Sequence, residues 1–148
     1  MTVESKKVLL VEDNEDDIDL TLLSFKNNHI ANEVIVVRDG AEALDYLFGT
    51  GKYADRDLSA HPVVVFLDIN LPKISGLEVL KRLRGDPRTK RLPIVMLTSS
   101  VEERDLITSY DLGVNSYIRK PVDLQQFNEA VKQLGMYWIL LNELPSKL

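Results

Sequence analysis

Short apolar runs alternate with longer amphipathic segments along the chain. The short runs are rich in β-branched residues and cover residues 8–11, 34–37, 63–67, 94–97 and, more weakly, 116–118. The longer segments repeat apolar residues at helical spacing, and their marker positions are Ile18, Leu22, Leu23 and Phe25; Ala43, Leu44 and Leu47; Leu77, Leu80 and Leu83; Leu106, Ile107 and Tyr110; and Leu124, Phe127, Val131 and Leu134. Glycines and prolines separate the segments. The pattern predicts five strands that alternate with five helices.

This alternation predicts an α/β fold in which helices cover both faces of a parallel sheet. The strand runs are continuously apolar, as expected for strands that are buried on both sides. A doubly wound sheet of five strands favours the flavodoxin-like order 2-1-3-4-5. Right-handed crossovers then place the carboxyl ends of the first and third strands side by side, and a crevice opens at that edge.

Length and composition fit one globular domain over residues 1–148, since 45% hydrophobic residues suffice for a single core. No apolar run approaches the roughly 20 residues of a membrane span, and the run at 8–11 is too short for a signal peptide. The lack of cysteine fits a reducing cytoplasm. A net charge of -5 argues against direct binding to nucleic acid or to an anionic membrane. The basic run KRLRGDPRTKR at 81–91 is expected to be a solvated face rather than a docking patch.

Polar residues follow the strands at the edge where the crevice is expected. Glu12 and Asp13 follow the first strand, and Asp68 follows the third. Carboxylates this close repel one another unless one is protonated or a divalent cation binds, and an all-oxygen donor set favours magnesium. Lys120, after the fifth strand, offers an ammonium group for a phosphate oxygen, and Thr98, after the fourth, offers a hydroxyl. The pattern predicts a phosphoryl-transfer site with Asp68 as the nucleophile.

Four motifs, in order and with suitable spacing, resemble the receiver domains of two-component response regulators. They are ED at 12–13, LDINLPKISG at 67–76, LTSS at 97–100 and YIRKP at 117–121. The resemblance extends from about residue 6 to residue 135. It implies that Asp68 accepts a phosphoryl group from a phosphohistidine of a partner histidine kinase. It also implies that Asp13 binds magnesium directly, Glu12 through water, and Asn70 through its backbone carbonyl.

The resemblance further implies a switch driven by the phosphoryl group. Lys120 would bind that group, and a cis peptide bond between Lys120 and Pro121 would aim the ammonium into the crevice. Thr98 would swing toward the phosphoryl group, and Tyr117 would rotate inward into the space that Thr98 leaves. The surface of the fourth helix, fifth strand and fifth helix would then change its affinity for partners.

The C-terminal stretch at about 135–148 is apolar on more than one helical face. Its large apolar side chains are Met136, Trp138, Ile139, Leu140 and Leu141. A helix that covers one side of a sheet normally keeps a polar outer stripe, so this extension predicts a homodimer interface, with core packing of a long last helix as the alternative. The extension and the insertion FGTGKYADRDLSAHP at 48–62 resemble the single-domain regulators of cyanobacterial phytochrome kinases. That resemblance implies a phytochrome-type kinase as partner and light as the input.

Three other functions fit the same fold. A phosphatase of the haloacid-dehalogenase type would need a carboxylate where Asn70 stands. A flavodoxin-like cofactor carrier would need a phosphate-binding loop where the chain has EDNEDD. A pseudo-receiver without chemistry would not need the complete acidic set. We therefore expect a receiver that catalyses only its own phosphorylation and dephosphorylation. Too little chain follows residue 135 for an output domain, so the output would be partner binding or phosphate relay.

Overall fold

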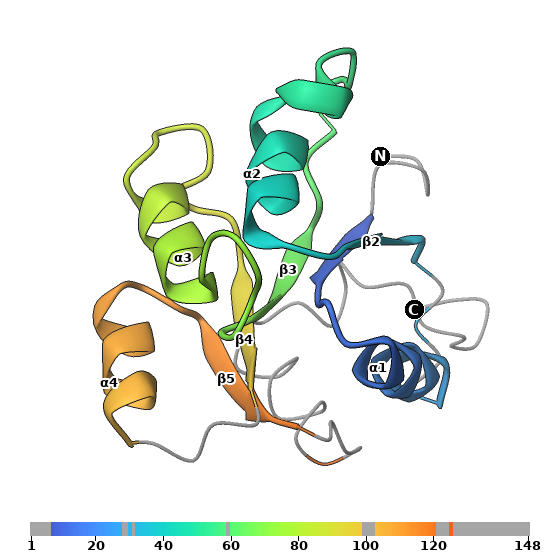
Figure 1. The fold of residues 1–148 in the computed structure, drawn as a ribbon, viewed down its shortest axis with the longest axis vertical. Helices are drawn as coiled ribbons and strands as arrows, with labels where there is room; N and C mark the ends of the chain where they lie inside the picture. The colour runs from blue at the N-terminus through green and yellow to red at the C-terminus, as the bar shows by residue number, and fades with distance from the viewer. Residues whose placement is uncertain are drawn as a thin grey trace, which may run out of the picture.

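Five parallel strands form one sheet in the described part of the chain (Figure 1). The computed structural model describes residues 7–27, 30, 32–58, 60–98, 103–120 and 125. The strands are β1 (Val8–Val11), β2 (Val34–Val37), β3 (Val64–Asp68), β4 (Ile94–Thr98) and β5 (Ser116–Arg119). Their order is β2-β1-β3-β4-β5, which confirms the predicted doubly wound topology. β3 begins and ends one residue later than expected, so Asp68 is its last residue and lies opposite Leu97 of β4.

Helices cover both faces of this sheet. They are α1 (Glu15–Asn27), α2 (Gly40–Phe48), α3 (Gly76–Arg84) and α4 (Glu103–Asp111), with a short 3-10 helix, η2 (Gly51–Tyr53). α2 and α3 pack on one face, and α1 packs on the other (Figure 1). The fifth expected helix, near residues 124–134, lies outside the described residues except at position 125. None of the helices that the structure describes is long and apolar enough to cross a membrane.

Alternate residues of each strand supply the two halves of the core. In β1, Leu9 and Val11 belong to the cluster under α2 and α3, whereas Val8 and Leu10 belong to the cluster under α1. All four side chains are buried. The continuous apolar run of β1 is therefore explained by helices on both sides of the sheet.

Three marker positions of the expected helices are exposed, not buried. Leu23 of α1 is 51% exposed, and Ile107 and Tyr110 of α4 are 54% and 48% exposed. The buried stripe of α1 passes through Thr21, and that of α4 passes through Ser109. Helical spacing predicted the helices correctly, but a small polar residue occupies part of each buried stripe, so the apolar residues alone do not give the orientation of the helix.

Two glycines hold the loop after β3 against the edge of the sheet. A Cβ atom on Gly76 would lie 2.0 Å from the backbone oxygen of Asp68, and one on Gly40 would lie 2.0 Å from the backbone oxygen of Ile74. The Gly40 N–H also donates to the carbonyl of Pro72 at 3.3 Å. Only glycine permits such close backbone approach. The first residues of α2 and α3 thus fix the loop that follows Asp68.

The insertion at 48–62 folds back onto α2. The Tyr53 hydroxyl donates to the Glu42 carboxylate at 2.8 Å, and the Tyr53 ring meets Tyr46 edge-on with centroids 5.1 Å apart. The Arg56 guanidinium lies 4.1 Å from the centre of the Tyr46 ring and donates to the Tyr46 carbonyl at 2.6 Å. Aromatic and cation–π contacts therefore attach this segment to the outer end of α2.

The basic side chains of the run at 81–91 are exposed, as expected, except that of Arg84. The guanidinium of Arg84 donates to the carbonyls of Gly113 and Leu92 at 2.8 Å and 2.7 Å, and to the side chain of Asn115 at 2.9 Å. Burial lowers the pKa of Arg84 from its ordinary value. Arg84 therefore ties α3 to the segment before β4 and to the loop before β5, and the solvated-face interpretation is wrong for this residue.

Candidate functional site

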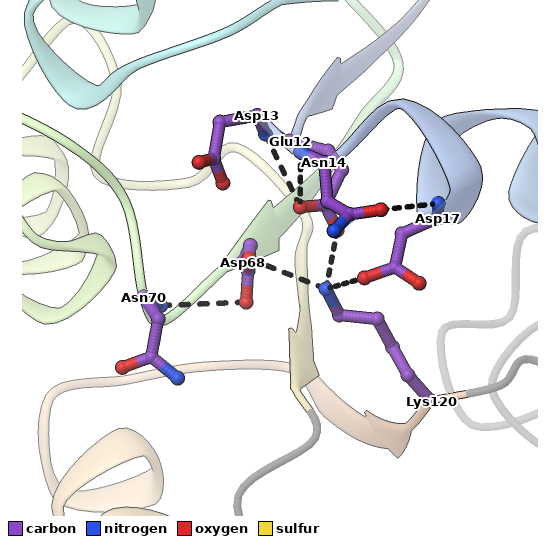
Figure 2. Close-up of polar contacts among 7 residues, drawn as sticks. All are labelled: Glu12, Asp13, Asn14, Asp17, Asp68, Asn70 and Lys120. Carbon is purple, nitrogen blue, oxygen red and sulfur yellow. Dashed lines mark hydrogen bonds and ion pairs between the residues drawn. The ribbon is translucent and has the colours of Figure 1, made fainter.

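Three carboxylates and one ammonium group meet at the carboxyl edge of the sheet, between β1 and β3 (Figure 2). Oxygen atoms of Glu12, Asp13 and Asp68 lie within 4.8 Å of one another. Val11 lies opposite Leu67 in the parallel ladder of β1 and β3. β1 and β3 therefore end at the same level of the sheet, and the residues that follow them lie close together. The structure has these carboxylates at one edge of the sheet, as the sequence predicts.

Glu12 is the most deeply buried of the three carboxylates in this cluster, with 0% exposure. Its Oε2 accepts the N–H groups of Asp13 at 3.1 Å and Asn14 at 3.2 Å, and its Oε1 accepts a hydrogen bond from Lys120. A buried carboxylate needs such partners, because it has lost its hydration. Glu12 is therefore held rigidly inside the site, whereas the Asp13 side chain is exposed at its mouth.

Lys120 reaches this cluster from the end of β5, and its side chain is only 8% exposed. In addition to Glu12, its Nζ donates to Asp17 Oδ2 at 2.8 Å and to Asp68 Oδ2 at 3.3 Å (Figure 2). Burial by itself lowers the pKa of Lys120, but its hydrogen bonds to Asp17 and Glu12 and the nearby charge of Asp68 outweigh that effect. The pKa of Lys120 is raised overall, so the ammonium group remains charged.

Asp68 is buried, with its side chain 5% exposed. Burial, and secondly the charge of Glu12, raise the pKa of Asp68 from 3.8 to about 7, and Lys120 opposes them only in part. Asp68 Oδ1 accepts the N–H of Asn70 at 3.3 Å. A carboxylate with such a pKa is only partly ionised at neutral pH, and a neighbouring cation favours its ionised, nucleophilic form.

The donor set at this edge fits a hard divalent cation. Every candidate ligand in the cluster is a carboxylate oxygen, and the three residues come from the ends of two adjacent strands. Burial, and secondly the charge of Glu12, raise the pKa of Asp68, and a dication relieves the repulsion between the two carboxylates. Oxygen donors of this kind suit magnesium or manganese better than metals that prefer sulfur or imidazole.

The other predicted site residues are described to different extents. Tyr117 lies in β5 opposite Met96 and packs, half-buried, against the core cluster under α2 and α3. The backbone of Thr98 ends β4 opposite Arg119. The Thr98 side chain lies outside the described part of the structure. So do Pro121 with its peptide bond, and the predicted interface residues Met136, Trp138, Ile139, Leu140 and Leu141.

Asp17 is a site residue that the sequence analysis missed. It lies in the first turn of α1, where its side chain reaches Lys120 at 2.8 Å. The sequence shows only that Asp17 is one of three consecutive acidic residues in the first turn of α1, and nothing in the pattern singles it out. The motifs that identify the other carboxylates do not include this position.

Comparison with known proteins agrees with this geometry. Residues 8–132 match the family described as the response regulator receiver domain. The chain belongs to this family. Response regulator Rcp1 of Synechocystis sp. (strain ATCC 27184 / PCC 6803 / Kazusa) is 38% identical over 141 residues, which cover 95% of this chain and 94% of Rcp1.

Two solved structures with a similar fold are response regulators of bacteriophytochromes. The bacteriophytochrome response regulator AtBRR is 52% identical, with a TM-score of 0.83 over 93% of this chain and 98% of that one. The bacteriophytochrome response regulator RtBRR is 50% identical, with a TM-score of 0.84 over 95% of this chain and 84% of that one. The chain is thus a response regulator related to those of phytochromes.

Proposed function

We propose that this protein is a phosphorylation-controlled switch that accepts a phosphoryl group from a histidine kinase onto Asp68. The observation that carries the proposal is the cluster around Asp68. A buried carboxylate with a raised pKa lies within 4.8 Å of two other carboxylates and within reach of a charged lysine. A site that only stabilised the fold would gain nothing from several carboxylates held this close together.

In the transfer step, an ionised oxygen of Asp68 attacks the phosphorus atom of a phosphohistidine. The new P–O bond forms an acyl phosphate as the P–N bond breaks, and the leaving imidazole nitrogen keeps the electron pair and takes up a proton. The chain contributes position and charge rather than an acid or a base, as is usual in phosphoryl transfer. The hydrogen bond from Asn70 N–H to Asp68 Oδ1 orients the carboxylate, so that Oδ2 faces Lys120.

A bound magnesium ion would offset the charges of the carboxylates and of the incoming phosphoryl group. Asp13 and Asp68 would hold it directly, the backbone carbonyl of Asn70 would complete the protein ligands, and Glu12 would act through a bound water. Glu12 suits the indirect role because its own oxygens are used by two backbone N–H groups and by Lys120. A solved structure of Rcp1, 38% identical with a TM-score of 0.74 over 95% of this chain and 99% of that one, is of the Mn(2+)-bound form.

Lys120 would bind an oxygen of the transferred group, and Thr98 and Tyr117 would pass the change to the surface of α4 and β5. In this view, Thr98 moves toward the phosphoryl group and the half-buried Tyr117 ring turns inward. A related structure, 44% identical with a TM-score of 0.75 over 95% of this chain and 99% of that one, is that of the phosphorylated cyanobacterial phytochrome response regulator RcpA.

The relatives also suggest partners. A phytochrome-type histidine kinase would supply the phosphoryl group. The apolar pattern of the C-terminal extension supports a homodimer interface made by Met136, Trp138, Ile139, Leu140 and Leu141. The protein would work in the cytoplasm and would turn over no external substrate. Asn70 supports this last point, because a phosphatase with an aspartate nucleophile would need an acid where this amide stands.

The experiment that tests the proposal is incubation with acetyl phosphate and magnesium, followed by intact mass measurement. Wild type should gain one phosphoryl group, and it should gain none when EDTA removes the metal. Asp68→Asn should gain none at this site, whereas Asp45→Asn, which removes a carboxylate from the outer end of α2, should label like wild type. Equal labelling of wild type and Asp68→Asn would reject the proposal.

A further inference from the structure

Asp17 is held in place to contact Lys120 from the first turn of α1 (Figure 2). The Asn14 side chain caps that turn, because its Oδ1 accepts the Asp17 N–H at 3.0 Å. The Asp17 carboxylate then lies 2.8 Å from Lys120 Nζ, closer than Asp68 at 3.3 Å. Lys120 is therefore bound more closely by a helix residue than by the expected phosphoryl acceptor.

All three N–H donors of the Lys120 ammonium group are engaged. They go to Glu12, Asp17 and Asp68. The phosphoryl group on Asp68 can take over the N–H that Asp68 now accepts, but it can gain a second hydrogen bond from Lys120 only if Glu12 or Asp17 gives up its own. The question is which of these two carboxylates does so.

Glu12 is poorly suited to release Lys120, since it is 0% exposed and two backbone N–H groups anchor its other oxygen. Asp68 carries the phosphoryl group itself, so its oxygen is replaced as a partner by the group that it holds. Asp17 differs from both, because its side chain is 31% exposed and water can solvate it after release. Asp17 is therefore the acceptor that yields at the lowest free-energy cost.

We propose that Asp17 is a positioning residue that competes with the phosphoryl group for Lys120 and so disfavours the phosphorylated state. The inference rests on the proposed function of Asp68. In the unphosphorylated protein, Asp17 draws the ammonium group toward α1. Phosphorylation transfers that ammonium to the new anion and leaves the Asp17 carboxylate free at the start of α1. The balance between the two acceptors sets how firmly the phosphoryl group is held.

If Asp17 competes for Lys120, replacing its carboxylate should increase the affinity of the site for a phosphoryl mimic. The probe is beryllofluoride, a stable phosphoryl mimic, titrated by calorimetry at constant saturating magnesium. Asp17→Asn should bind it about threefold to tenfold more tightly than wild type, as expected for loss of a partly exposed charged hydrogen bond. Asp17→Glu, which keeps a carboxylate within reach of Lys120, should return the affinity toward that of wild type.

Asp16→Asn is the matched control. Asp16 is an exposed acid in the same first turn of α1, so its removal makes the same change in net charge and in the helix-terminus interaction. Its beryllofluoride affinity should stay within about twofold of wild type. Equal affinities of Asp17→Asn and Asp16→Asn, or a weaker affinity of Asp17→Asn, would overturn the competition.

A double-mutant cycle on stability tests the contact without any phosphoryl chemistry. Urea unfolding of wild type, Asp17→Asn, Lys120→Met and the double variant should give a favourable coupling between the two residues, and strictly additive effects would contradict it. The two proposals fail differently. Wild type that neither binds beryllofluoride nor takes up a phosphoryl group would reject the proposed function, whereas normal wild-type binding without a gain in Asp17→Asn rejects the role of Asp17 alone.

Discussion

Asp68 should lower the stability of the folded protein at neutral pH, and the substitution Asp68→Asn should remove this effect. The pKa of Asp68 is raised to about 7 in the folded protein from an ordinary value of 3.8. The folded protein therefore holds this proton more tightly than the unfolded chain does. The stability that comes from this proton is fully present below pH 4 and is lost as the pH rises through about 7.

The size of the effect follows from the two pKa values. They differ by about 3, and each pKa unit corresponds to about 1.4 kcal/mol, so the upper limit is about 4 kcal/mol. Movement of Lys120 toward the ionised Asp68 carboxylate offsets part of this loss of stability. We expect Asp68→Asn to raise the free energy of unfolding by about 1–3 kcal/mol at pH 8 and by less than about 0.5 kcal/mol at pH 4.

The assay is urea unfolding of both proteins between pH 4 and pH 8 in EDTA. Asp19→Asn, which removes an exposed carboxylate from α1, serves as the control and should change stability by less than about 0.5 kcal/mol throughout. Magnesium should reduce the difference in unfolding free energy between wild type and Asp68→Asn, because a dication stabilises the ionised carboxylates. An Asp68→Asn protein that is no more stable than wild type at pH 8 would refute the reasoning.

Two further predictions concern regions away from the carboxylate cluster. Arg84→Met should lower the free energy of unfolding by about 1–2 kcal/mol, because the carbonyls of Gly113 and Leu92 lose a charged donor, while the exposed control Arg82→Met should cost less than about 0.5 kcal/mol. If urea unfolding shows that Arg84→Met and Arg82→Met lose the same free energy of unfolding, this role of Arg84 is contradicted. Trp138→Glu should shift sedimentation from dimer to monomer; an unchanged sedimentation coefficient would remove the proposed interface.

Much of the site could be predicted because it depends on topology alone. Parallel strands place their carboxyl ends at one edge, and the order 2-1-3-4-5 makes β1 and β3 neighbours. The residues after these strands must then meet, whatever the details of packing. Glu12, Asp13 and Asp68 were found in this way, and Lys120 was found from the last strand.

What the sequence did not predict depends on how side chains are oriented. The contact between Asp17 and Lys120 requires a particular rotation of α1, and apolar spacing does not fix that rotation when Thr21 lies on the buried stripe. The same limit explains why Leu23 is exposed. The role of Arg84 is not predictable because most of its partners are backbone carbonyls, which leave no trace in the amino-acid sequence.

The most direct test of the account is to locate the phosphoryl group on the chain. Wild type would be labelled with acetyl phosphate and magnesium and then treated with borohydride, which reduces an acyl phosphate to an alcohol and turns the labelled aspartate into homoserine. Peptide mass spectrometry should find homoserine at position 68. Homoserine at another aspartate, or none in protein that carries the label, would contradict the central role of Asp68.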